Sequence, residues 1–229
     1  MGSPKAILDR MNVSPSNLSH SELYGLLLNS VAPRPIAWVS TLSASGQPNL
    51  APFSFFNCVC VEPPLLAFAP GQRTPKHSRS SHPESRSEDR GEDKDTLRNI
   101  RETKEFVVNV VTYDLAEAMN LTSGEYDASV NEFELAQIDS APSQVVKVPR
   151  VAASPVSFEC RLYQILDFSP SPRGSSLVIG QIVSIHVNDA HMKEGKLDRN
   201  SLDLIGRMGG IQYTKTTQRF EMVRPKVGQ

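Results

Sequence analysis

The alternation of apolar and polar positions predicts that most of the chain forms β-strands. Residues 35–41 (PIAWVST) carry β-branched and aromatic side chains and predict a first strand. A break containing Gly and Pro follows, and residues 50–62 (LAPFSFFNCVCVE) predict a second, longer strand. Two prolines end this run, and residues 65–70 predict a third strand. We therefore expect residues 35–70 to form an antiparallel meander.

The second half of the chain carries the same pattern over longer runs. Residues 105–111 predict one strand, and residues 154–168 and 175–189 predict two more, joined by a connection (SPSPRG) that is typical of a hairpin. Near the C-terminus, the adjacent Gly209 and Gly210 indicate a tight turn or a close approach of the backbone. The pattern favours a mainly β fold, an antiparallel barrel with short peripheral helices, over a doubly wound parallel sheet.

Three short helices are expected outside the barrel. Residues 18–27 have leucines at near-helical spacing behind a serine that suits an N-cap. A second helix is expected over residues 96–103, with Asp95 or Thr96 as its cap, and a third starts at Asp114. These helices are too few and too short to form a layer of their own.

One segment departs from this pattern. Residues 71–94 contain no Ile, Leu, Val, Phe, Tyr, Trp or Met and are rich in Ser, Arg, Glu and Pro. Such a composition cannot bury enough apolar surface to offset the entropy lost on ordering. We expect a polar, mobile insertion at about residues 71–92 within one domain that spans residues 1–229.

Charge and cysteine content narrow the class of protein. A net charge of −1 gives no electrostatic footprint for nucleic acid or an anionic membrane, and no apolar run approaches the roughly 20 residues that span a bilayer. The start has no apolar signal region, and three cysteines argue against a disulfide framework. We expect a reduced, cytoplasmic protein in which Cys58 and Cys60 are buried as small hydrophobic side chains.

The motifs that usually announce enzymatic chemistry are missing. The chain has no dinucleotide fingerprint, phosphate-binding P-loop, zinc-protease helix or hydrolase nucleophile elbow, and we expect no metal site. His186 is a single histidine on a predicted strand, and we interpret it as a surface or dimer-facing side chain. If the protein is an enzyme, a cofactor supplies its chemistry.

Six sequence blocks, taken in order, resemble the flavin reductase-like family. They are SVAPRPIAWVSTLSASGQPNLAPFSFFNCVCVEPP, KDTLRNIRETKEFVVNVV, NEFELA, SPVSFECRL, IGQIVSIHV and IGRMGGIQY, and they cover most of residues 22–214. The resemblance implies an FMN-binding split β-barrel, antiparallel with Greek-key connections and flavoredoxin-like. The polar insertion is a departure, since family members usually have a much shorter link there.

The resemblance also implies which residues bind the cofactor. Residues 40–42 would run beside the isoalloxazine ring, largely through backbone groups, and residues 54–57 would face the flavin and its ribityl chain. Residues 94–96 open a helix whose free N–H groups and positive dipole suit a phosphate. Two arginines complete a site shared between two chains. The candidate FMN-binding residues are Arg34, Ser40, Thr41, Leu42, Ser54, Phe55, Asn57, Lys94, Asp95, Thr96 and Arg207.

The implied activity is an NAD(P)H-dependent FMN reductase, in which hydride passes from nicotinamide C4 to flavin N5 in a homodimer. NADH or NADPH would be the donor, and a partner monooxygenase or a small molecule would accept the electrons. No catalytic side chain is nominated, because such a transfer needs stacking geometry more than an acid or base. Two alternatives stay open. The barrel could transform a specific organic substrate in a biosynthetic pathway, with FMN bound or without redox turnover, or it could be a non-enzymatic flavin-binding module.

Overall fold

The computed structural model describes residues 12–73, 92–171 and 173–227. Most of the expected insertion at 71–92 lies outside these residues. The helices are α1 (His20–Ser30), α2 (Asp95–Thr103), α3 (Ala116–Leu121) and α4 (Glu132–Leu135), with 3-10 turns η1 (Pro15–Asn17), η3 (Tyr113–Leu115) and η4 (Asp189–His191). No helix within these ranges is long and apolar enough to cross a membrane.

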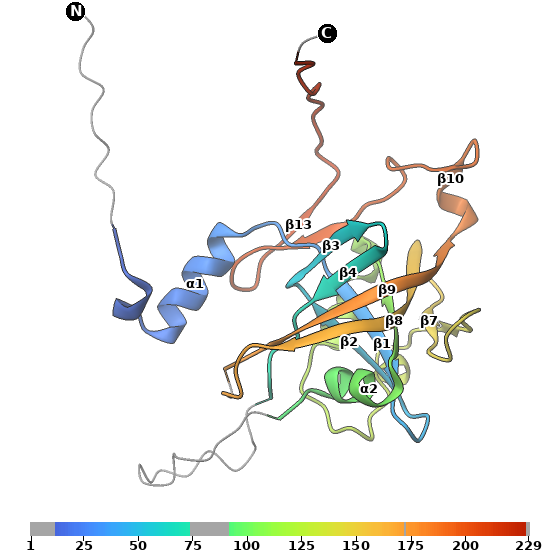
Figure 1. The fold of residues 1–229 in the computed structure, drawn as a ribbon. Coiled ribbons are helices and arrows are strands. Elements are labelled where there is room, and N and C mark those ends of the chain that lie inside the picture. Colours follow the sequence, from blue (N-terminus) through green and yellow to red (C-terminus); the bar gives the residue numbers. More distant parts are fainter. Residues whose placement is uncertain (1–11, 74–91, 172, 228–229) are drawn as a thin grey trace, which may run out of the picture.

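A single seven-stranded sheet, antiparallel at every pairing, forms the barrel, in the order β2-β1-β5-β8-β9-β4-β3 (Figure 1). Its strands are β1 (Ala37–Leu42), β2 (Pro48–Phe53), β3 (Phe56–Val61), β4 (Pro64–Phe68), β5 (Glu105–Asn109), β8 (Val156–Asp167) and β9 (Ser176–Val187). The minor strands are β6 (Ser140–Ala141), β7 (Arg150–Val151), β10 (Met192–Lys193), β11 (Lys196–Leu197), β12 (Ile205–Arg207) and β13 (Tyr213–Lys215). The expected hairpin of two long strands is β8–β9.

The predicted meander over residues 35–70 is wrong in one respect. Residues 50–62 do not form one strand: the chain bends at Ser54 and Phe55, and the two halves, β2 and β3, lie at opposite edges of the sheet. Pro48 and Pro52 are tolerated because β2 is an edge strand, where a missing N–H breaks no ladder. The bend therefore carries the chain from one edge of the split barrel to the other.

Alternation along β1 separates two cores. Ala37 and Val39 pack in the barrel interior with Phe68 and Phe106, whereas Ile36 and Trp38 face a second cluster on the other side of the strand. Helix α2 closes the barrel end, because Leu97 and Ile100, three positions apart, enter the first cluster. The first turn of α2 is therefore fixed against β1 and β2.

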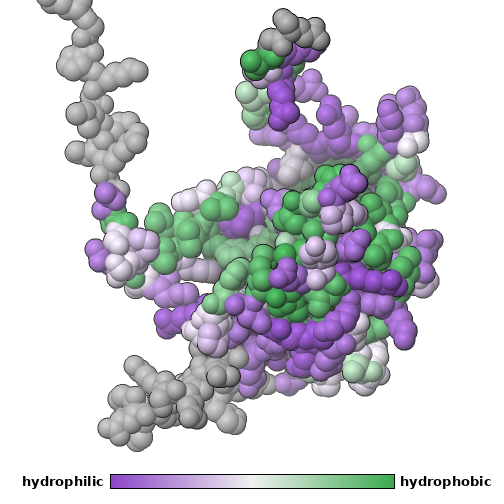
Figure 2. Space-filling view, in the orientation of Figure 1, coloured by the Kyte–Doolittle hydropathy of each residue, from purple (hydrophilic) through white to green (hydrophobic). Residues whose placement is uncertain are grey.

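Helix α1 stands away from the sheet (Figure 1). A capping box of Ser19 and Glu22 starts it, yet none of its residues is buried. Tyr24, Leu26 and Leu27 are each about half exposed, and apolar side chains gather over this helix in Figure 2. A helix with an apolar surface and no buried residue lacks a packing partner within the described chain.

Two smaller groups of expectations need revision, and one is confirmed. Cys58 is exposed and Cys60 is half-buried, because β3 is an edge strand with an irregular register between them. Helix α2 starts one residue earlier than expected, so Lys94 is its N-cap. The double-glycine turn is confirmed: Gly210 has φ +56, and a Cβ on Gly209 would lie 1.8 Å from the Asn29 side-chain oxygen.

Candidate functional site

A small polar cleft lies at the N-terminus of α2. We call it the α2 cleft: it has a volume of about 50 Å³, and β2, the first turn of α2, residues 122–126, Arg73 and Glu132 line it. The cleft is small and has a polar lining, so it suits a small polar group.

The first turn of α2 has unused donors. Its N-cap, Lys94, makes no side-chain capping bond, and the first intrahelical bond runs from the Arg98 N–H to the Lys94 carbonyl. Among the described residues, the N–H groups of residues 95–97 have no acceptor. The helix dipole and the Lys94 side chain add positive charge at the cleft. This arrangement favours an anion.

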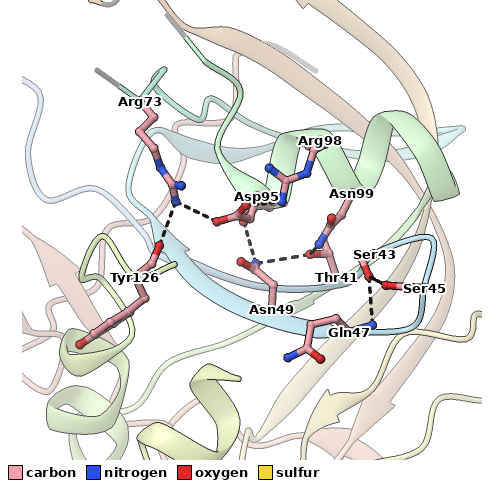
Figure 3. Close-up of polar contacts among 11 residues, drawn as sticks. Thr41, Ser43, Ser45, Gln47, Asn49, Arg73, Asp95, Arg98, Asn99 and Tyr126 are labelled. Atoms are coloured by element: carbon pink, nitrogen blue, oxygen red, sulfur yellow. Dashed lines mark hydrogen bonds and ion pairs between the residues drawn. The ribbon is translucent and has the colours of Figure 1, made fainter. Parts of the chain in front are cut away.

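A buried amide network holds the first turn in place (Figure 3). Asn49 Nδ2 donates to Thr96 Oγ1 at 3.0 Å and to Thr41 Oγ1 at 3.3 Å. Asn99 Nδ2 donates to the same Thr41 oxygen at 3.0 Å. All four side chains are almost fully buried. Thr41 and Thr96, two of the predicted binding residues, thus lie next to each other.

The negative charge of Asp95 at the cleft is compensated by neighbouring arginines. Its carboxylate pairs with Arg73 at 2.8 Å and also with Arg98. Arg73 donates a further bond of 3.3 Å to the Tyr126 carbonyl (Figure 3). The Asp95 carboxylate therefore holds two arginines in place and accepts hydrogen bonds. The donor that Asp95 offers to a ligand is its backbone N–H.

Sequence reasoning missed Glu132, which also lines the cleft. The side chain is buried and accepts the Leu50 N–H at 3.1 Å. Burial raises the pKa of Glu132, the Leu50 bond opposes this, and the nearby Asp95 charge raises it further. It lies in the block NEFELA, but only the tertiary structure shows that it faces β2.

A larger apolar groove is lined by the residues that follow β2 and by the end of α1. We call it the α1 groove: it has a volume of about 330 Å³ between the end of α1 and residues 54–57. Phe53 lines the α2 cleft, whereas Ser54, the next residue, lines the groove. Ser54, Phe55 and Asn57 all border the groove, as one continuous segment. Three of the predicted flavin-contacting residues therefore border one groove, in the segment that directly follows a strand of the α2 cleft.

Arg34 and Arg207 occupy a different position from the one expected. Arg34 lines the α1 groove but is buried, and its terminal nitrogens donate to the carbonyls of Leu28, Val31 and Met208. Arg207 covers the Tyr213 ring at 4.4 Å. Arg34 therefore ties α1 to the C-terminal region, and neither guanidinium lines the α2 cleft.

The side chains of Ser40 and Leu42 line neither the α2 cleft nor the α1 groove. Ser40 is fully buried on the opposite face of β1 from Thr41 and donates to the Pro149 carbonyl at 2.6 Å. Its backbone lies between β2 and β5 in the ladder. Leu42 packs against a third apolar cluster with Val107. Successive strand residues point to opposite faces, so Ser40 and Thr41 cannot both face one site.

A second charged centre was also missed. The Glu159 carboxylate is fully buried and accepts the N–H groups of residues 144–146 at 2.7, 2.7 and 2.9 Å. It also contacts His186, which is therefore not simply a surface residue. Burial alone would raise the pKa of Glu159, but the Gln144 bond, His186 and the other two N–H groups together lower it to about 2.

Comparisons with known proteins agree with this architecture. The model of the flavin reductase like domain matches residues 29–201. The structure of Pseudomonas fluorescens 2-nitrobenzoate 2-nitroreductase is 33% identical, covers 94% of this chain and 96% of its own, and has a TM-score of 0.78. Nitrilotriacetate monooxygenase component B from Bacillus cereus is 30% identical, with coverage of 93% and 99% and a TM-score of 0.82.

A third structure supports the fold alone. A protein with a split barrel domain from Shewanella frigidimarina is 21% identical, covers 94% of this chain and all of its own, and has a TM-score of 0.73. The expected mainly β split barrel is therefore confirmed. Together the findings support a flavin-related oxidoreductase. The chain belongs to the flavin reductase-like domain family.

Proposed function

We propose that this protein binds FMN and catalyses hydride transfer from NADH or NADPH to the flavin. One observation carries the proposal: two consecutive residues, Phe53 and Ser54, line a small polar cleft at a helix N-terminus and a larger apolar groove, respectively. An FMN molecule has the same two parts, a phosphate and a ring system.

The residues present fit the two parts. Lys94, Thr96 and the open N–H groups of α2 would hold the phosphate. Phe55, Ser54 and Asn57 would contact the ring and the ribityl chain, and the groove volume of about 330 Å³ lies within the range of small-molecule sites. Thr41 supports this arrangement indirectly, because it binds Asn49 and Asn99 behind the first turn of α2.

The bound FMN would supply the redox chemistry, accepting a hydride at N5 from nicotinamide C4. The protein's own residues bind and orient the cofactor and restrict water around it. No histidine borders either cavity among the described residues, and we assign no acid or base.

We also propose a cytoplasmic homodimer. Leu27 and Val31, at the end of α1, are exposed apolar residues that border the groove, so a second copy that covered them would also enclose the ring. The reduced flavin would serve a monooxygenase partner, because the similar Bacillus cereus protein is a monooxygenase component.

A second candidate is direct reduction of a small organic substrate by tightly bound FMN. The similar Pseudomonas fluorescens protein is a nitroreductase, and this observation favours a small-molecule acceptor. The two candidates differ in whether FMN leaves the protein in each cycle.

An absorbance spectrum of the purified protein, followed by anaerobic addition of NADH or NADPH, tests the proposal. We expect bound or added FMN to lose its visible absorbance on addition of either donor. Failure to bind FMN at micromolar concentration would overturn the proposal. Binding with no loss of absorbance would favour the non-enzymatic module instead.

A further inference from the structure

The stem of the polar insertion supplies a residue to the α2 cleft. Arg73 precedes the insertion and Glu92 follows it, and their backbones pair through bonds of 2.8 and 3.0 Å. This pairing places the Arg73 side chain in the cleft wall. We propose that Arg73 closes the cleft behind the phosphate and makes the site selective for FMN over FAD. The inference rests on the proposed function, because it concerns the same flavin site.

The contacts of Arg73 form a bridge across one end of the cleft. One terminal nitrogen of its guanidinium donates both to Asp95, at 2.8 Å, and to the Tyr126 carbonyl, at 3.3 Å (Figure 3). Asp95 belongs to the first turn of α2, and Tyr126 belongs to the opposite wall. The Arg73 Nε is buried and has no partner among the described residues, so one donor stays unused.

The opposite wall is itself compact. Thr122 is held by the Trp38 indole N–H at 2.9 Å, and the Tyr126 hydroxyl donates to the Leu121 carbonyl at 2.9 Å. A Cβ on Gly124 would lie only 2.7 Å from the Tyr126 ring, so this wall is packed closely against itself. Opening the cleft would therefore require breaking the Arg73 bridge or unfolding this segment.

FMN and FAD differ at the phosphate that the cleft would hold. FMN ends in a phosphate monoester, whereas the phosphate of FAD continues through a second phosphate to adenosine. The Arg73 bridge crosses one end of the small cleft that would hold the phosphate, so the continuation of FAD would have to displace this bridge.

Binding measurements on three flavins test the inference. We would titrate the full-length protein with FMN, FAD and riboflavin and follow quenching of flavin fluorescence. Wild type is expected to bind FMN at least about tenfold more tightly than FAD, a difference of roughly 1.4 kcal/mol. Riboflavin should bind more weakly than FMN, because it lacks the phosphate.

Arg73→Ala is the decisive variant, and Arg98→Ala is its matched control. Both arginines pair with Asp95, but Arg98 does not line the cleft. Arg73→Ala should bring the FMN-to-FAD affinity ratio close to one, while Arg98→Ala should keep the wild-type ratio. Arg73→Lys retains the charge without the planar guanidinium, so its ratio should also fall.

The outcomes are distinguishable. Equal wild-type affinity for FMN and FAD, or an unchanged ratio in both Arg73 variants, overturns the role of Arg73 while the proposed function stands. No binding of any flavin by wild type overturns the proposed function itself. If Arg73→Ala does not fold, as judged by circular dichroism, the ratio measured for Arg73→Lys decides.

Discussion

Residues 144–146 and the first turn of α2 each carry three consecutive backbone N–H groups outside the hydrogen-bond ladders, but they are satisfied differently. At residues 144–146 the acceptor is the buried Glu159 carboxylate. At residues 95–97 no acceptor is found among the described residues, and the N-cap is a lysine. The first group of N–H donors has its acceptor within the chain, whereas the second group lines a cleft.

The comparison separates a structural anion site from a candidate ligand site. Both use backbone donors, which suit a negative charge wherever they converge. The first turn of α2 lines a cleft, whereas the donors at residues 144–146 are occupied by a side chain of the same protein. We therefore expect changes at Glu159 to alter folding stability without altering flavin affinity, and Lys94→Ala to alter flavin affinity without altering folding stability.

The largest effect is expected for Glu159→Ala. Removing this carboxylate leaves three N–H groups and His186 without their acceptor, so the free energy of unfolding should fall by about 3–5 kcal/mol. Urea unfolding monitored by circular dichroism measures the loss. FMN affinity of the folded fraction should stay at the wild-type value.

Glu105→Ala is a matched control for that variant. Glu105 accepts a single N–H, from Lys147 in the same loop, at 3.0 Å and at an exposed position. Its loss should cost less than about 1 kcal/mol. Equal destabilisation by both variants would show that the three-donor cluster has no special role.

The second effect is a loss of folding stability at low pH. The pKa of Glu159 in the folded protein is about 2, below its ordinary value of 4.5, because the three N–H groups and His186 outweigh the effect of burial. A lowered folded-state pKa gives stability that is fully present above about pH 4.5 and is lost as pH falls towards 2. The loss should be about 3 kcal/mol in total. Between those pH values the free energy of unfolding should depend less on pH in Glu159→Gln than in wild type. An identical pH dependence would contradict the assignment of this loss to Glu159.

The third effect is on the cofactor. Lys94→Ala should weaken FMN binding by about 1.5–3 kcal/mol, the range for a hydrogen bond to a charged group, and should leave riboflavin binding unchanged. Thr96→Val should weaken FMN in the same direction. Fluorescence titration measures both affinities. Unchanged FMN affinity in both variants would remove the phosphate from the α2 cleft.

The fold was predictable wherever local patterning and register agreed. The β8–β9 hairpin and the strand β5 follow directly from their apolar patterns, and the six-block resemblance supplied the barrel. The division of residues 50–62 into β2 and β3 was not predictable from pattern, because Ser54 and Phe55 carry no strong turn signal. Barrel closure, a tertiary effect, decides where that run bends.

The site was predictable only in part. Local helix chemistry placed residues 94–96 correctly at a helix N-terminus, because that property depends on neighbouring residues alone. Arg73, Asn49 and Glu132 were missed, because what brings them to the cleft is tertiary packing across β2, α2 and the loop at 122–126. The contacts expected of residues 40–42 run largely through backbone groups, whereas alternation along β1 turns the Ser40 hydroxyl to the opposite face from Thr41.

The smallest effect tests, through folding stability, whether the N–H groups of residues 95–97 lack an acceptor. A serine at an N-cap accepts an N–H from the first turn of the helix, as Ser19 does from Glu22 in α1. Lys94→Ser should therefore supply an acceptor that α2 lacks and raise the free energy of unfolding by about 0.5–1 kcal/mol without flavin. Lys94→Ala, which offers no acceptor, should show no such gain. The same Lys94→Ser variant should bind FMN more weakly than wild type, because its hydroxyl competes for the donors that the phosphate needs. Thermal unfolding with and without FMN measures both effects, and a destabilised Lys94→Ser protein would show that these N–H groups already have acceptors.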